Sequence, residues 1–239
     1  MARAKKANVT KLRIIQVGTR MFLEKGYSNT STSMLCKELE ISPGNLTFHF
    51  ATKEHLLTVL VDMLCDFQMQ VMQHYLDEGK TSLMALCLEL MTMAAICEES
   101  EAAKDFYISS YTHPMTLEII RKNDKERAKT IFGEFCKDWT DVQFREAEVL
   151  VSGIEYGTLM TTESSSPLDM RIAGALDGIM KIFEVPKETR KMKIEKVMAM
   201  DYRSIGRSIL KEFIEYIETT NEQALEEMLK SKAKKSSEA

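Results

Sequence analysis

Short polar and basic side chains are concentrated between residues 31 and 53 of this 239-residue chain. The amide of Asn45 can donate one hydrogen bond and accept another, which is the pairing that the major-groove edge of adenine requires. Hydroxyl, imidazole and ammonium groups nearby are suited to phosphate oxygens. We expect base readout by Asn45, an approach shaped by Pro43, Gly44 and Thr47, and phosphate contacts from Ser31, Thr32, His49 and Lys53.

Each of the main candidates also has an ordinary structural alternative. Asn45 could be a solvated residue of a short helix, and His49, between two phenylalanines, could satisfy a buried hydrogen bond. Lys53 could pair with Glu54 or simply be solvated.

Three short helices must position these side chains. Apolar residues at helical spacing predict a helix over residues 9–25 that ends at Gly26, and either Thr30 or Ser31 can cap a second helix. Ser42 followed by Pro43 pairs a capping side chain with proline at the first helical position, so a third helix runs to about residue 50. We assign Leu35, Leu39, Leu46, Phe48 and Phe50 to the core or wedge between these helices.

The charge of the chain is distributed unevenly. Residues 1–55 contain nine Lys/Arg and four Asp/Glu, whereas the remaining residues contain 23 and 32. A basic head on an acidic body is typical of a protein in which only the head meets a polyanion. Lys5, Lys6 and Lys11 would add a basic arm to the expected DNA contacts.

Residues 26–57 resemble the N-terminal DNA-binding domain of the TetR/AcrR family of one-component transcriptional regulators. Gly26 and Tyr27 close the first helix, Ser31 opens the second, residues 42–46 open the recognition helix, and His49-Phe50 precede Lys53 at the head of the fourth. The resemblance implies a helix-turn-helix head and a transcriptional repressor that a small, largely apolar effector releases from a double-stranded DNA operator.

Two residues depart from the family pattern. Thr47 stands where the family usually has tyrosine, so a hydroxyl remains but the aromatic reach is lost. Glu40 stands where the tight turn usually has glycine, and a positive φ there would cost on the order of 1 kcal/mol. These departures keep a second interpretation open, a helical adaptor or interaction protein that has lost specific DNA binding.

The rest of the chain is predicted to be helical, because it has few glycines and prolines. A long helix should run from a cap at Thr52 to Gly79, followed by helices at about 81–99, 101–113, 115–138, 141–163 and 167–184 and a final segment from 187 to about 230. The expected fold is all-α, with a three-helix domain over residues 1–55, a larger helical effector-binding and dimerisation domain over 56–230, and a disordered tail over 231–239.

Specific readout generally needs a second recognition helix about 34–36 Å away, so we expect a homodimer. Gly153 and Gly157 lie four residues apart, as do Gly174 and Gly178, which suggests close approach of two helices. The interface is predicted to contain Leu150, Gly153, Ile154, Gly157, Leu176, Gly178, Ile179 and Phe183. Packing of these residues within one chain is the alternative.

Methionine and aromatic residues are frequent between residues 60 and 140. Methionine fills irregular space and tolerates varied ligands, although such residues more often form ordinary core. Family resemblance implies an effector pocket here, and its candidate lining is Phe67, Met91, Tyr107, Tyr111 and Trp139.

Nothing in the sequence indicates catalysis. The chain has no phosphate-binding loop, no HExxH motif and no paired cysteines, and its four histidines are scattered, so we expect no enzyme, no metal site and no cofactor. The five separated cysteines fit reduced core residues in a cytoplasmic protein, and a redox sensor using Cys87, Cys97 or Cys136 is a weaker interpretation. No apolar run reaches the roughly 18–20 residues of a membrane span.

Overall fold

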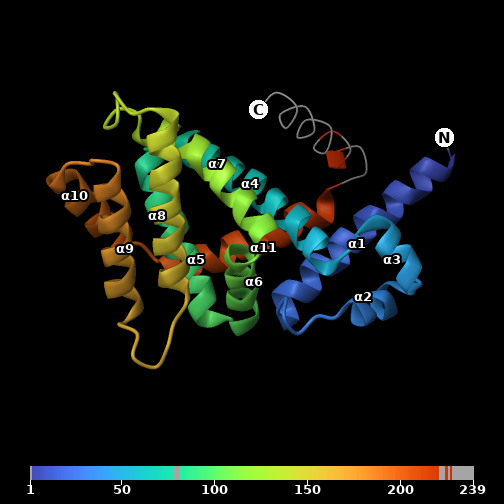
Figure 1. The fold of residues 1–239 in the computed structure, drawn as a ribbon. Helices are drawn as coiled ribbons and strands as arrows, with labels where there is room; N and C mark the ends of the chain where they lie inside the picture. The colour runs from blue at the N-terminus through green and yellow to red at the C-terminus, as the bar shows by residue number, and fades with distance from the viewer. Residues whose placement is uncertain (1, 78–80, 221–223, 226, 228–239) are drawn as a thin grey trace.

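The computed structural model describes residues 2–77, 81–220, 224, 225 and 227. These residues contain eleven α-helices and no strand. The helices are α1 (Ala2–Lys25), α2 (Thr32–Leu39), α3 (Pro43–His49), α4 (Lys53–Asp77), α5 (Ser82–Glu99), α6 (Glu101–Thr112), α7 (Pro114–Phe132), α8 (Asp141–Leu159), α9 (Leu168–Ile182), α10 (Lys187–Met198) and α11 (Tyr202–Thr219). Helices α1–α3 form a head at one end, and α4 runs from it into the body formed by α5–α11 (Figure 1). The all-α fold predicted from the sequence is confirmed.

Local backbone chemistry defines the three helices of the head. Gly26 has a φ of +89° at the end of α1, as expected of a left-handed cap. Ser31 caps α2 by accepting from the Met34 amide, whereas the Thr30 side chain is buried and donates to the carbonyl of Gly26. The predicted Ser42 cap and Pro43 start of α3 are confirmed, with Ser42 Oγ accepting from the Asn45 amide at 3.2 Å.

A small hydrophobic core holds the head together. Leu35, Leu39, Leu46 and Phe50 are buried in it as predicted. The assignment of Phe48 to this core is wrong, because its side chain is 76% exposed. Successive helical residues are rotated by about 100°, so Phe48 lies on the opposite side of α3 from Leu46.

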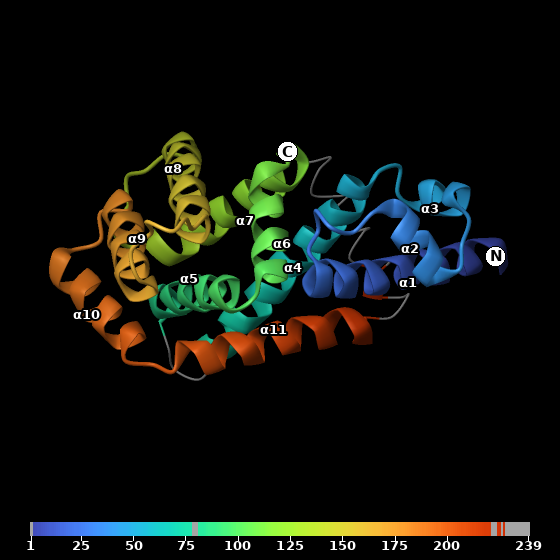
Figure 2. The same ribbon diagram turned by 90° about the horizontal axis from the view of Figure 1, so that it is seen from below.

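Helix α5 forms the centre of the body, with thirteen of its residues buried. Helix α11 lies along α5 and continues towards α1 of the head (Figure 2). Gly206 permits this close packing, because a Cβ atom there would lie 3.1 Å from the carbonyl oxygen of Thr92. The five cysteines are buried and free, which agrees with their assignment as reduced core residues.

Several predicted boundaries in the body are wrong. Helix α7 ends at Phe132 instead of residue 138, because the turn that follows folds the buried Cys136 back so that its Sγ donates to the Phe183 carbonyl. The segment from 187 is two helices, separated where Asp201 caps α11 by accepting from the Ser204 amide. The tail over 231–239 and the side chains of Lys5 and Lys6 lie outside the described residues.

None of the described helices has the length and apolar character needed to cross a bilayer.

The turn between α2 and α3 provides a test of local strain. Glu40 adopts a φ of +54°, the left-handed conformation expected there. We predict that Glu40→Gly increases the free energy of unfolding by about 1 kcal/mol, because glycine removes the steric cost of Cβ. Glu40→Ala keeps Cβ and should give no such gain. Urea denaturation measures the free energy of unfolding of both variants. A Glu40→Gly protein less stable than the unmodified one would show that the backbone at Glu40 is not strained.

Candidate nucleic-acid interface

The N-terminal turn of α3 faces outward. Ser42, Pro43, Gly44, Asn45 and Thr47 are exposed, while the buried Leu46 anchors the helix from beneath. The side-chain amide of Asn45 makes no hydrogen bond to any described residue. It is therefore available to an external partner.

Several predicted contact residues meet in a surface depression between α2, α3 and the start of α4. This depression has a volume of about 200 Å³ and is lined in part by Thr32, Pro43, Thr47 and Lys53. Ser31 and Thr32 are exposed at the N-terminus of α2. The Thr47 hydroxyl donates to the Pro43 carbonyl at 2.9 Å, so it must release that bond before it can donate to a phosphate.

His49 is half-buried at the end of α3 and packs edge-on against Phe48, with 5.0 Å between ring centroids. Burial, with a smaller contribution from the charge of Lys11, lowers the pKa of His49 below its ordinary value. His49 is therefore mainly neutral near pH 7. It can form a hydrogen bond but adds little positive charge to the surface.

Lys53 is engaged within the head. Its Nζ donates to the carbonyls of Tyr27 at 2.9 Å and Thr30 at 3.1 Å, and lies 3.9 Å from the centroid of the Tyr27 ring. Burial lowers the pKa of Lys53. Glu54 instead accepts from the Tyr27 hydroxyl at 3.3 Å. Lys53 therefore does not form the pair with Glu54 that one interpretation of the sequence proposes. It holds the turn between α1 and α2 through its two carbonyl contacts.

Sequence reasoning missed Phe48 as a surface residue. It lies on the outward side of α3, one residue after Thr47 and three residues after Asn45, and its exposed ring is the largest apolar group of that helix. An exposed aromatic ring on a polar helix can pack against the methyl group of thymine.

Polar contacts join the head to the body. The carboxylate of Asp105 on α6 accepts from the amide and the hydroxyl of Ser28, both at 2.7 Å. Tyr27 and His113 pack edge-on with 5.2 Å between ring centroids. Gln16 of α1 donates to the Glu218 carbonyl at the end of α11 at 3.0 Å. Helices α6 and α11 therefore touch the head in addition to α4.

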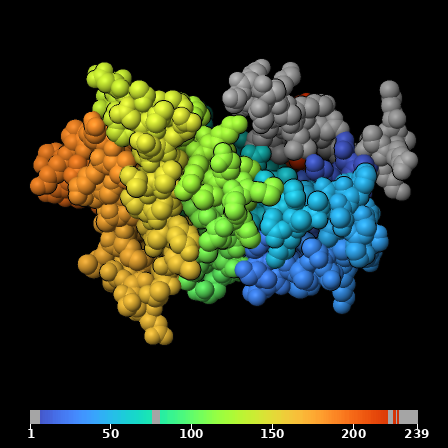
Figure 3. Space-filling model, viewed as in Figure 1, coloured from blue at the N-terminus to red at the C-terminus, as the bar shows by residue number. Residues whose placement is uncertain are grey.

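The residues predicted for the dimer interface divide into three groups. Leu176, Ile179 and Phe183 are buried within the chain, so their assignment to the interface is wrong; they are part of the core beneath α9. Leu150, Gly153 and Gly157 are exposed on α8, which crosses the face seen in Figure 3. Ile154 is half-buried and lies 3.6 Å from the position that a Cβ of Gly178 would occupy.

An apolar strip remains at the surface of α8 and α9. It comprises Val142, Val149, Leu150, Gly153, Gly157, Met160, Met170 and Gly174. A Cβ atom at Gly153, Gly157 or Gly174 would meet nothing within 4 Å, so these glycines are not required by packing within the chain.

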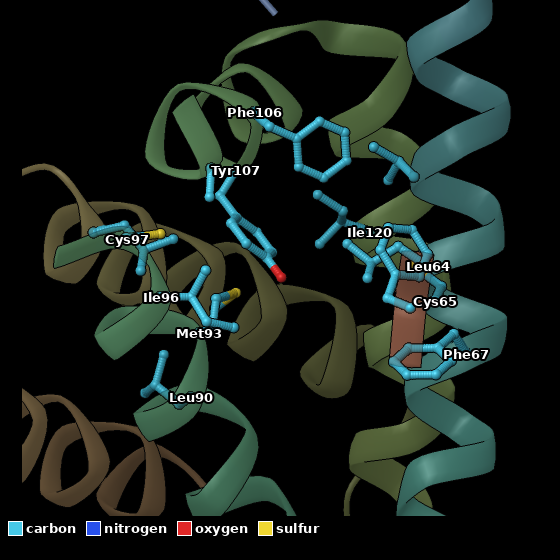
Figure 4. Packing of buried hydrophobic residues seen from close by; sticks show 14 of the residues in the cluster. Leu64, Cys65, Phe67, Leu90, Met93, Ile96, Cys97, Phe106, Tyr107 and Ile120 are labelled. Carbon is cyan, nitrogen blue, oxygen red and sulfur yellow. The ribbon is translucent and has the colours of Figure 1, made fainter. Parts of the chain in front are cut away.

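Of the five residues predicted to line the effector pocket, three line cavities in the body and two do not. Phe67, Tyr107 and Tyr111 line adjoining cavities in the body, and the Tyr107 hydroxyl points into the space between α4 and α5 (Figure 4). Met91 is fully buried away from these cavities. Trp139 lies in the turn after α7, where it packs on Phe144 and Phe183.

Comparisons with known proteins agree with the geometry of the head. Residues 14–60 match the family described as bacterial regulatory proteins, tetR family. The chain is 36% identical over 55 residues to the HTH-type transcriptional regulator UidR of Escherichia coli K12, which is 23% of this chain and 28% of UidR. It is 38% identical over 51 residues to the HTH-type transcriptional regulator QacR of Staphylococcus aureus Mu50, or 21% and 27% of the two chains.

The match therefore spans only about a quarter of the length of these curated relatives. Among solved structures, GusR of Salmonella enterica is similar with a TM-score of 0.48 and 21% identity, covering 73% of this chain and 95% of GusR. In its N-terminal helix-turn-helix segment, residues 14–60, the chain is therefore similar to the tetR family of bacterial regulatory proteins.

Proposed function

We propose that the protein is a dimeric DNA-binding transcriptional regulator of the cytoplasm, a repressor that leaves its operator when a small, largely apolar effector binds the body. The observation that carries this proposal is the outward-facing N-terminal turn of α3, with an unengaged Asn45 amide on a helix anchored by Leu46. The match of UidR and QacR, both described as transcriptional regulators, supports it.

In this proposal, Asn45 reads a base edge while Pro43 and Gly44 let α3 approach the major groove. Ser31, Thr32, Thr47 and His49 bond to phosphate oxygens around it, and Phe48 packs against a thymine methyl group. Lys53 contributes mainly by holding the turn before α2, with one N–H left for a phosphate.

Two copies pair through the apolar strip of α8 and α9. The large apolar side chains of this strip are exposed in the monomer. In the proposed dimer, this strip is buried against the same strip of a second copy, and each protomer supplies one α3 helix to the duplex. An effector that displaces α4 or α6 in the body would then change the separation of the heads, because both helices contact the head.

The assignment of Asn45 can be tested on the DNA upstream of the protein's own gene. Asn45→Ala should weaken specific binding by about 1–3 kcal/mol and leave non-specific binding nearly unchanged, because only a base contact is lost. Fluorescence anisotropy over a range of salt concentrations measures both. Asn123→Ala, in α7 of the body, serves as the control. Equal affinity of the Asn45→Ala and unmodified proteins for that DNA would reject base readout by this residue.

Lys53 should affect stability as well as DNA binding. Lys53→Met removes two hydrogen bonds to the turn between α1 and α2, and we expect a loss of about 1–2 kcal/mol in unfolding free energy. Urea denaturation measures it, with the exposed Lys37→Met as the control. Weaker DNA binding at unchanged stability would show that Lys53 acts on phosphate alone.

The dimer surface can be tested where the monomer has room. Gly153→Arg should leave the fold intact, because a side chain there meets no neighbour, but should separate the protomers by steric and charge conflict. Sedimentation equilibrium at micromolar concentration is expected to give a dimer for the unmodified protein and for the exposed control Glu188→Arg, and a monomer for Gly153→Arg. A Gly153→Arg protein that remains dimeric would place the interface elsewhere.

A further inference from the structure

Four carboxylates lie together inside the body. Glu89 of α5, Asp124 of α7, and Glu148 and Glu155 of α8 line one cavity, with Leu86 and Phe132 among its apolar walls. Glu148 is 2% exposed, and Glu155 is also buried. Carboxylates are seldom buried without matching positive charge, so this grouping needs an explanation.

The positive charges of the cluster are too few. Arg127 donates to Asp124 at 3.1 Å and forms an ion pair with Glu89, which leaves Glu148 and Glu155 without a guanidinium bond. Arg121 influences Glu148 electrostatically, but its Nε donates to the Ser152 hydroxyl. The cluster thus has two more carboxylates than guanidinium groups.

The two carboxylates of α8 differ in their hydrogen bonding. Glu155 accepts from the Tyr111 hydroxyl at 3.0 Å. Glu148 Oε1 is fully buried and has no hydrogen-bond partner among the described residues. An acceptor in this position, at the wall of a cavity, is suited to a donor that the chain itself does not supply.

The cavity continues into an apolar region. A neighbouring cavity between α4, α5, α6 and α7 shares Glu89, Asp124 and Glu155 with it, and a third cavity towards α11 shares Glu89 and Tyr107 with the second. Each has a volume of about 30 Å³, enough for an ammonium-sized group. Met72 and Met93 line the third and can move to admit an apolar chain.

From these observations we propose that the effector is an organic ammonium ion, with its charged nitrogen donating to Glu148 and Glu155 and its apolar chain extending along α4 and α5 towards α11. This inference rests on the proposed function, in which the body binds an effector. The carboxylates disfavour an anion, whereas an ammonium ion can compensate the charge that Glu148 and Glu155 carry once they release their protons. No group of three or more His, Cys, Asp or Glu in the described chain could hold a metal ion, which favours an organic cation.

Proton release distinguishes this proposal from simple filling of a cavity. Burial and the neighbouring carboxylates raise the pKa of Glu148 to about 10 and that of Glu155 to about 8, so both bind a proton for most of the time at pH 7. Cys65, Tyr111, Arg121 and Arg127 also face the cluster from α4, α6 and α7. An ammonium ion favours the ionised carboxylates, so its binding should release about one proton.

The test is isothermal titration calorimetry at pH 7.0 on the full chain without DNA, with hexylamine, hexan-1-ol, hexanoate and hexyltrimethylammonium as probes. Hexylamine should bind at least about tenfold more tightly than the others, and its heat should differ between phosphate and Tris buffers according to the proton released. Equal affinity for hexylamine and hexan-1-ol, or hexylamine binding without proton release, would overturn the proposal. Because no DNA is present, these outcomes leave the proposed DNA binding untouched.

Variants locate the ammonium group. Glu148→Gln should lower hexylamine affinity at least about tenfold without changing hexan-1-ol binding, whereas Glu146→Gln, exposed on the same helix, should have no effect. Glu155→Gln should cause the same loss of hexylamine affinity. It provides the test if Glu148→Gln fails to fold. Hexylamine affinity that survives in the folded variants would place the cation elsewhere.

Discussion

The orientation of α3 depends on the burial of two side chains. Leu46 and Phe50 pack into the core of the head, and because α3 has only seven residues, their burial fixes which side of it faces outward. The N-cap from Ser42 then sets where the helix begins. Asn45, Thr47 and Phe48 are thereby presented on the outer side without help from the body.

The head is held by more than its own core. Helix α4 is continuous from Lys53 into the body, Asp105 of α6 bonds to the turn after α1, and the end of α11 bonds to Gln16. Helices α4, α6 and α11 also contact α5 and supply residues around the proposed effector cavities. A change in these cavities can therefore reach the head through three helices, and the contacts of α6 and α11 with the head were not predicted from the sequence.

Local signals allowed the head to be predicted from the sequence, and long-range packing limited the prediction of the body. Gly26, Ser42 and Pro43 each act on neighbouring backbone, so their roles could be derived from position alone. Lys53 could not be placed, because its carbonyl acceptors depend on the path of a turn. In α9, the apolar residues follow one face that includes Leu176, with Met170 on the other side, but periodicity alone does not tell whether that face packs within the chain or against a second copy. A signal for the acidic cluster was present, since Glu148 and Glu155 share the helical face of Phe144 and Val151.

The most direct test of the central claim, that two outward-facing α3 helices read a duplex, is selection of binding sites by the full chain from a pool of random double-stranded DNA. Two copies related by a two-fold axis should enrich an inverted repeat whose half-sites are centred about 34–36 Å apart, one turn of the double helix. Failure to enrich any sequence, or enrichment of a single half-site without its inverted copy, would contradict the account.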